Sequence, residues 1–537
     1  MHILEKYKSP LKKLVAFFKK SRDDWKRKCH DAKEELKLAR KNNKNLRESK
    51  KIFKEKVKCL EADISKLNSA KEALEQEVHE LQKTVDSIID NAQALNIVPE
   101  RHQYPIGIIY MYISLVLTAS TSLRGASKAL EVFISTLNLD CSTPSWPSGR
   151  LWLLRLGYYK LTRPKEKADD WIYVADHFIQ LDNKKCFVIM GIRQSQLSNL
   201  DRALIYEDME PLAILPVNKS NGKIVCEQLE QTIQKTGVPC AIVGDYGSDL
   251  KKGVDEFCNK YPKTVYIHDI KHKTALILKH ELEKDKDWQE FNRLRSVTKQ
   301  KIQQTPLSFL NPRQQRTKAR YMNVDASIEW GVNALDFIEK QAKNPSFDKK
   351  MSEDNLGWIR NYKELIEQWN LILTMVSITE QRVRKQGIHK DIYSSVKKEI
   401  STISNSSKRV KNVRKQLLDF VKLESLKVVF KEKLLGSSEI IESVFGKLKE
   451  VEKEQSKSGL TGLVLTLAAM VSTTSMDVLT KALESVPVKK VMDWCEEHIG
   501  ETVQSKRKKF LKGSSRKKFP EGYKRKEQKR GKLLVPI

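Results

Sequence analysis

The stretch Trp171-Ile-Tyr-Val-Ala-Asp176 decides the fold of this chain, because it places an acid inside a β-rich apolar run. In a strand, Asp176 shares one face with Ile172 and Val174 and interrupts an otherwise apolar row. A buried carboxylate is costly unless a metal ion or hydrogen bonds compensate its charge. We interpret Asp176 as a metal ligand; the alternative is a structural acid held by backbone amides or by His177.

The residues that follow predict a mixed α/β sheet. Three closely joined strands precede strands that alternate with helices. The predicted strands are 171–181, 185–192, 212–217, 240–244 and 264–268, and the predicted helices between and after them are 222–235, 250–260 and 271–283.

Two further acids join Asp176 as candidates. Asp245 directly follows the strand Ala241-Ile-Val-Gly244, so its carboxylate emerges at the carboxyl edge of the sheet, where α/β sheets bind ligands. Glu442 lies in the helical run Ser438-Glu-Ile-Ile-Glu-Ser-Val-Phe-Gly-Lys-Leu-Lys449. Acids placed in this way suggest a site for a hard cation such as magnesium, which prefers oxygen ligands.

Asp269 is the alternative to these acids as a metal ligand. It follows the last predicted strand in Ile267-His-Asp-Ile-Lys-His272, where His268 and His272 flank it. Acids and histidines at strand ends are also common as helix caps or structural partners, so the roles of these three residues stay open.

The charge of the chain favours a polyanionic partner. Its 537 residues carry 99 Lys+Arg against 68 Asp+Glu, a formal net charge of +31, and 40% hydrophobic content is enough for folded cores. The eight cysteines are scattered without a Cys-x-x-Cys pair, which excludes a zinc ribbon or a disulfide framework. Together with the acids, this charge points to phosphodiester chemistry on nucleic acid.

A heptad repeat runs from about residue 36 to residue 88 and predicts a coiled coil. β-Branched residues at position a with leucine at position d favour a parallel dimer, whereas Asn43, Lys50 and Lys71 at position a reduce stability and fix the register. We therefore expect a homodimer through this segment; the alternative is a long helix folded back on its own protein. Position a holds Leu36, Asn43, Lys50, Val57, Ile64, Lys71, Val78 and Val85, and position d holds Ala39, Leu46, Phe53, Leu60, Leu67, Leu74, Leu81 and Ile88.

Three short helical patterns follow Pro105, at 106–118, 122–137 and 145–156, and fit a helix-turn-helix-like unit. If the third helix reads DNA, Ser148, Arg150 and Arg155 face the groove, and its apolar residues pack inward. The alternative is an ordinary helical linker domain.

The whole chain divides into six predicted segments. They are a basic arm and coiled coil at 1–98, the helix-turn-helix-like domain at 99–165, the first part of the core at 166–284, an all-helical insertion at 285–433, the second part of the core at 434–500, and a basic tail at 501–537. Between residues 506 and 532 the tail holds 14 Lys+Arg and two Glu, which predicts a nonspecific phosphate contact.

The order of Asp176 on a strand, Asp245 after a strand, a helical insertion and Glu442 on a helix resembles the DDE transposases of bacterial insertion sequences. The resemblance covers about residues 105–480, and its most specific stretch is Ile440-Ile-Glu-Ser-Val-Phe-Gly-Lys-Leu-Lys449. It implies a catalytic core with the ribonuclease H-like fold shared with retroviral integrases. It also implies that the three acids are catalytic and hold two Mg²⁺ ions, for which Mn²⁺ substitutes.

The activity implied by this resemblance is cleavage at transposon ends, followed by transfer of the freed 3′-hydroxyl into target DNA. Lys449 lies two helical turns after Glu442, so it is expected, with Lys447, to contact DNA. The partners are then transposon terminal repeats and target DNA, with no membrane, in the cytoplasm or nucleoid. The alternatives are a transposase-derived protein that binds DNA without cutting it, and a metal-dependent nuclease or resolvase without strand transfer.

Overall fold

The computed structural model describes residues 10–179, 184–200, 202–313, 324–343, 348–404, 407–429, 433–452 and 459–514. The chain divides into two compact units, Met1–Ala94 and Leu95–Ile537. The first unit is essentially one helix, and the second contains the sheet and the other helices.

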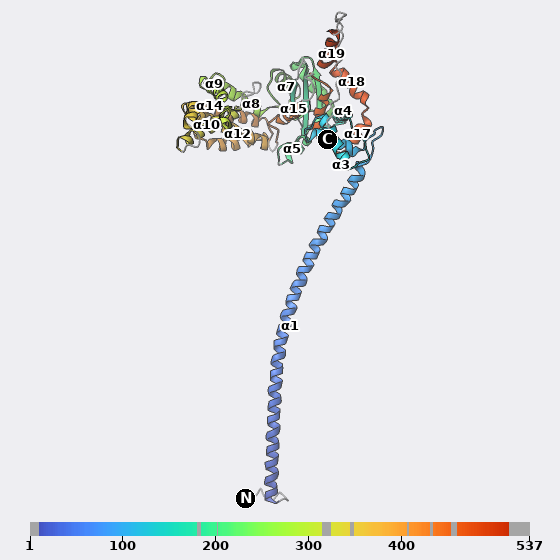
Figure 1. Ribbon diagram of the computed structural model, residues 1–537, viewed down its shortest axis with the longest axis vertical. Helices are drawn as coiled ribbons and strands as arrows, with labels where there is room; N and C mark the ends of the chain where they lie inside the picture. The colour runs from blue at the N-terminus through green and yellow to red at the C-terminus, as the bar shows by residue number, and fades with distance from the viewer. Residues whose placement is uncertain are drawn as a thin grey trace, which may run out of the picture. The chain divides into compact units, whose positions relative to one another are not determined.

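The first unit confirms the predicted long helix. Helix α1 (Leu11–Leu95) is unbroken over 85 residues, as Figure 1 shows. Apolar residues along it are exposed: Leu46, Phe53 and Leu67 each expose more than 60% of their surface.

The sheet of the second unit has five strands in the order β3-β2-β1-β4-β5. Strands β1, β2 and β3 are antiparallel neighbours, whereas β4 and β5 run parallel to β1. The strands are β1 (Trp171–Ile179), β2 (Lys185–Arg193), β3 (Glu210–Val217), β4 (Ala241–Gly244) and β5 (Val265–His268). The predicted mixed α/β core is confirmed, since all five strands lie within a few residues of their expected positions.

One face of the sheet is covered by helices α6 (Gly222–Thr236) and α7 (Ser248–Lys260). Side chains alternate along a strand, so every second residue of β1 belongs to this layer. Its buried members on β1 are Trp171, Tyr173 and Ala175.

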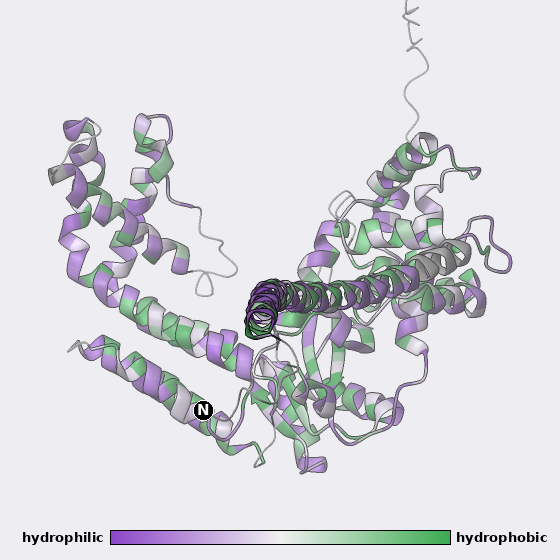
Figure 2. Ribbon diagram, turned by 90° about the horizontal axis from the view of Figure 1, so that it is seen from below, coloured by the Kyte–Doolittle hydropathy of each residue, from purple (hydrophilic) through white to green (hydrophobic). Residues whose placement is uncertain are grey.

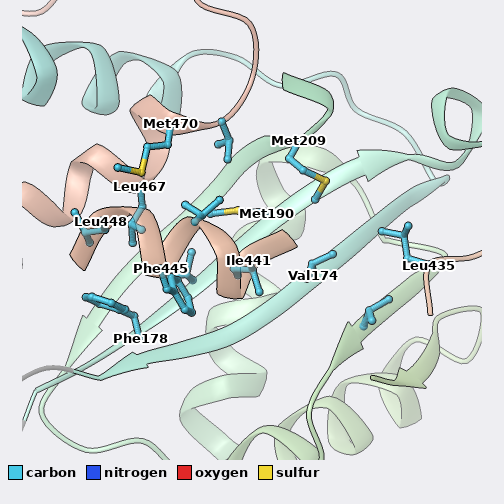
Figure 3. Packing of buried hydrophobic residues seen from close by; sticks show 14 of the residues in the cluster. Val174, Phe178, Met190, Met209, Leu435, Ile441, Phe445, Leu448, Leu467 and Met470 are labelled. Atoms are coloured by element: carbon cyan, nitrogen blue, oxygen red, sulfur yellow. The ribbon is translucent and has the colours of Figure 1, made fainter. Parts of the chain in front are cut away.

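The opposite face is covered by helices α4 (Trp146–Thr162), α15 (Glu439–Glu452) and α16 (Thr466–Met470). Figure 3 shows Ile441, Phe445 and Leu448 of α15 packed over Val174 and Phe178 of β1. The rings of Phe178 and Phe445 have centroids 5.1 Å apart. Helix α15 returns from a distant part of the sequence and is fixed to β1 by these apolar contacts.

The three helices expected after Pro105 are present as α2 (Ile106–Leu117), α3 (Leu123–Thr136) and α4, and they pack against one another. Their capping serines, Ser122 and Ser145, accept backbone hydrogen bonds at the starts of α3 and α4. Helix α4 is longer than predicted, and the consecutive residues Trp152, Leu153 and Leu154 are all buried, so more than one side of the helix is covered. It packs against α16 and the sheet, and this changes the expected role of its side chains.

The all-helical insertion is confirmed. Its helices are mostly amphipathic, and Figure 2 shows hydrophilic and hydrophobic residues interspersed along them. After β5 the chain forms α8 (Ile270–Leu282), α9 (Lys286–Ile302), α10 (Asp325–Lys343), α11 (Lys349–Leu356), α12 (Lys363–Gln386), α13 (Ile392–Ser401) and α14 (Lys408–Leu426), and then returns to the core through α15.

The described chain also contains the short helix α5 (Gln194–Ser198) after β2 and ends with three helices, α17 (Met476–Ser485), α18 (Val488–His498) and α19 (Val503–Ser514). Most of the predicted basic tail lies outside the described residues. None of the helices that the structure describes combines the length and the apolar character that crossing a bilayer requires.

Candidate active site

The sheet register places Asp176 and Asp245 at the same level. Val174 of β1 pairs with Val243 of the parallel strand β4, and each aspartate lies two residues further along its chain. Both valines belong to the layer covered by α15, so the alternation along the strands directs the two acids toward this helix. The two carboxylates therefore lie side by side at the carboxyl edge of the sheet.

Backbone amides hold both aspartates. The amide of His177 donates to Asp176 Oδ1 at 2.6 Å, and the amide of Gly247 donates to Asp245 Oδ1 at 3.1 Å. The hydroxyl of Tyr266 on β5 donates to the carbonyl of Asp245. The backbone contact to Asp176 is the one that the structural alternative anticipated, but it occupies only one carboxylate oxygen.

Glu442 reaches the same region from α15. The helix contacts β1, and Phe445, one turn after Glu442, packs on Phe178, two residues after Asp176. The side chain of Glu442 is 35% exposed, and its Oε1 lies 2.8 Å from His272 Nε2. The glutamate is thus partly open to solvent and oriented by a histidine from another helix.

Asp269 links the two ends of the helical insertion through buried hydrogen bonds. Its side chain is fully buried, and Oδ1 accepts the backbone amide of His272 at 2.7 Å, which caps α8. Oδ2 accepts the amide and the hydroxyl of Ser438, just before α15. Both oxygens are therefore already bound, and Asp269 acts here as a helix cap and positioning group.

His268 and His272 have different surroundings. His268 is buried and stacks on Tyr246 with ring centroids 3.7 Å apart, and burial lowers its pKa to about 3. Burial by itself lowers the pKa of His272, but the hydrogen bond to Glu442 and the charges of Asp269 and Glu442 raise it to about 9. His272 is therefore an imidazolium that donates to Glu442, whereas His268 is a neutral core residue.

The raised pKa of Asp176 reflects its burial and its repulsion by the other acids. Burial, then the charge of Asp245 and to a smaller extent that of Glu442, raise the pKa of Asp176 to about 7. The backbone hydrogen bond from His177 and the charge of His272 act in the opposite direction. The three predicted acids are therefore close enough to interact, and a bound cation would relieve the repulsion between them.

The donor chemistry of these acids fits a hard divalent cation, since all three supply carboxylate oxygens. Within the ranges that the structure describes, no group of three or more His, Cys, Asp or Glu side chains is gathered closely enough to hold a metal ion. Glu442 is held by His272.

The structure corrects the predicted DNA-reading role of Arg155. Its guanidinium donates to the carbonyls of Val486 and Leu483 and lies 3.0 Å from His102 Nε2. Arg155 therefore fastens the end of α17 to α4. The physical reason is that α4 is buried against the C-terminal helices, a contact that the local sequence does not reveal.

Arg150 and Ser148 are also engaged within the protein. Burial lowers the pKa of Arg150. The hydroxyl of Ser148 lies 3.0 Å from that of Ser145, the cap of α4. The apolar residues expected to pack inward, Trp152, Leu153 and Leu156, are buried, so this half of the prediction is confirmed.

The two lysines predicted near Glu442 lie on different sides of α15. Lys449 is exposed, with its ammonium 5.7 Å from the ring centroid of Phe178. Lys447 lies 4.8 Å from the ring centroid of Tyr206, and burial lowers its pKa. Only Lys449 is beside the strand that carries Asp176.

Sequence reasoning missed two groups that shape this site. Ser438 was not considered as a partner of Asp269, although serine directly before a helix signals a local hydrogen-bonding role. Lys160 of α4 is fully buried and donates to the carbonyls of Val471 and Ser472 at 2.8 and 2.7 Å. The sequence signal for this buried role is a lysine within a helical run that is otherwise largely apolar.

Comparison with known proteins does not assign this chain to a family. No family model matches the chain, and no curated protein matches its sequence. Among solved structures, the chain is similar to one described as the Drosophila P element transposase strand transfer complex, with a TM-score of 0.35 and 12% identity over 76% of this chain and 98% of that one. That TM-score is too low to establish a shared fold.

Proposed function

We propose that the chain is a DDE-type DNA transposase with a ribonuclease H-like core, in which Asp176, Asp245 and Glu442 are the catalytic acids. The observation that carries this proposal is the convergence of three distant segments. The β1–β4 register aligns the two aspartates, and apolar packing on β1 brings the helix of Glu442 beside them.

The ligands in this proposal are two Mg²⁺ ions, or Mn²⁺ in their place. Two such ions bridged by shared carboxylates activate an attacking oxygen and stabilise a leaving oxygen in phosphodiester chemistry. Asp176 and Asp245 supply oxygens from a rigid sheet, and Glu442 supplies its own from the helix. His272 orients the side chain of Glu442, and the hydrogen bond between Ser438 and Asp269 fixes the start of its helix, before any metal ion binds.

The proposed substrate is DNA, first at a transposon end and then at a target. The formal net charge of +31 supports a polyanionic substrate. Pairing of two chains through α1 would hold two DNA ends in one complex, and the exposed apolar residues of this helix support such pairing.

One incubation tests the activity. Purified protein is mixed with labelled transposon-end DNA, a target plasmid and Mg²⁺, and the products are separated on a gel. Joined products are expected. Cut DNA that is never joined would indicate a nuclease or resolvase, and bound but intact DNA would indicate a protein that has lost cleavage.

A further inference from the structure

Two adjoining cavities lie beside α15. The larger, about 690 Å³, is bounded by α2, α15 and residues 469–474, and the smaller, about 240 Å³, by the end of α12 and residues 433–437. Both are lined by Leu204, Ile440 and Ser443, so they meet along the first turns of α15. We call the two cavities together the α15 groove.

The α15 groove is basic. Its lining carries five cationic side chains and two acidic ones. Arg202 is bound by Asp208, with nitrogen–oxygen distances of 2.7 and 2.8 Å, and Arg384 is bound by Glu439 at 2.7 Å. Over the ranges described, no carboxylate forms an ion pair with the other three cations, Lys385, Lys433 and Lys447. Lys433 donates to the carbonyl of Leu200 at 3.5 Å, and the charge of Glu207, which lines the same cavity, acts on Lys447. The three lysines still give the groove a positive charge that an anionic ligand can bind.

The larger cavity also presents an aromatic side chain. The hydroxyl of Tyr206 lies 2.6 Å from that of Ser443, which fixes the ring against α15, and Lys447 lies over the same ring. An aromatic ring next to lysines is the combination that binds unpaired bases and the phosphates between them. A base inside a duplex cannot enter such a cavity, because it stays in the stack.

The groove and the candidate active site share helix α15 but lie on different sides of it: Ser443 and Lys447 line the groove, whereas Phe445 and Lys449 lie against Phe178 of β1. We infer that the α15 groove binds single-stranded DNA, with a base against Tyr206 and phosphates along Lys385, Lys433 and Lys447. This inference rests on the proposed function for its choice of DNA as the polymer. In that setting, the bound strand is one that has been unpaired at a DNA end.

The test measures binding of a short labelled single strand, and of the same sequence as a duplex, by fluorescence anisotropy at several salt concentrations. The variant replaces Lys385, Lys433 and Lys447 of the full chain by Ala. The salt slope, log K against log[salt], is expected to become shallower by about 2 for the single strand, because each phosphate contact contributes about 0.7. Tyr206→Ala is expected to weaken single-strand binding by roughly tenfold or more.

The matched control replaces Lys223, Lys252 and Lys263 by Ala, three exposed lysines on or next to α6 and α7 across the sheet. Circular dichroism checks that every variant is folded. An unchanged salt slope in the groove variant, an equal change in the control, or an equal loss of duplex binding would each overturn the inference. Asp176→Asn separates it from the proposed function, because this variant should lose cleavage and keep lysine-dependent strand binding.

Discussion

At the scale of single residues, the site combines groups that repel one another with groups that hold them in place. Asp176 and Asp245 are neighbours on the sheet, and Glu442 is kept beside them by an imidazolium. This arrangement has a cost in the absence of a cation, since burial and like charges destabilise ionised Asp176. A carboxyl group whose ionised form is destabilised in this way is typical of functional sites.

Replacing any of the three acids by Ala should reduce Mg²⁺-dependent cleavage by about a thousandfold or more, because several kcal/mol of charge stabilisation are lost with the ligand. Binding of the DNA end should persist. Gel assays of cleavage and binding on the same samples check this, with removal of Mg²⁺ by a chelator as the control. Nicking that is retained in Mg²⁺ by one of these variants would remove that acid from the catalytic set.

Asp269→Ala should destabilise the fold by about 2–4 kcal/mol, because it removes a helix cap and leaves the buried groups of Ser438 unpaired. Denaturant unfolding measures this change. Cleavage at saturating Mg²⁺ and below the unfolding range should be partly retained. A loss as complete as that of Asp245→Ala, without destabilisation, would indicate that Asp269 is a metal ligand after all.

At the scale of elements, α4 is the helix whose role differs most from expectation. Its serine cap and apolar content were recognised, but the helix forms part of the core of the second unit and its polar groups are used internally. Lys160 binds oxygens of residues 469–474, and Arg155 binds the end of α17. The three-helix unit therefore packs into the core of the second unit, and its binding to DNA stays a prediction.

Lys160→Met keeps the length of the side chain but leaves several buried oxygens of residues 469–474 without a donor. We expect a loss of about 3 kcal/mol or more in the free energy of unfolding, since each unpaired buried acceptor costs about 1–3 kcal/mol. Denaturant titration followed by tryptophan fluorescence measures it. Lys165→Met, which removes contacts to Glu210 and to the carbonyl of Lys160 but none to residues 469–474, provides a comparison. Equal, small effects of both changes would argue against the anchoring role of Lys160.

The heptad register of α1 extends upstream of the predicted segment, because the helix begins at Leu11. Val15 and Cys29 continue position a, and Phe18 and Trp25 continue position d; all four are exposed. A surface patch on α1 is lined by Leu67, Lys71, Leu74 and Val78 at a and d positions, together with Ala70 and Glu75. These residues form the seam that a second copy would cover.

In a parallel, in-register dimer, Cys29 faces Cys29 of the second copy, whereas Cys59 lies at the outer position c. Mild oxidation of the full chain should therefore give a covalent dimer that Cys29→Ser abolishes and Cys59→Ser does not, because paired Cα atoms must lie within about 7 Å. Denaturing gels without reductant report the product.

An antiparallel pair would separate the two Cys29 residues by tens of ångströms, given about 1.5 Å per helical residue. A dimer detected by light scattering without the Cys29 link would therefore exclude the parallel, in-register arrangement. A monomeric full chain would exclude pairing altogether.

At the scale of the whole molecule, the two units are stabilised in different ways. The unit Leu95–Ile537 has its own sheet and cores, while Met1–Ala94 contributes a helix without internal packing. A single exposed helix gains stability mainly by packing against a partner.

A chain truncated to residues 95–537 should therefore fold with a melting temperature close to that of the full protein and run as a monomer. Differential scanning calorimetry and light scattering measure the two properties. Single-end cleavage should continue, whereas products that need two paired ends should fall. Loss of folding in the truncated chain would show that α1 contributes to the core.

The sequence alone determined the local structure of this protein. Alternation of apolar residues, capping serines and heptads depend on near neighbours in the chain, so the strands, the helical insertion and α1 were predictable. Only the tertiary structure decided which polar groups face one another: Asp269 with Ser438, His272 with Glu442, and Arg155 with α17. Those contacts join residues that are far apart in the chain, and their partners are set by how the helices pack rather than by any local pattern.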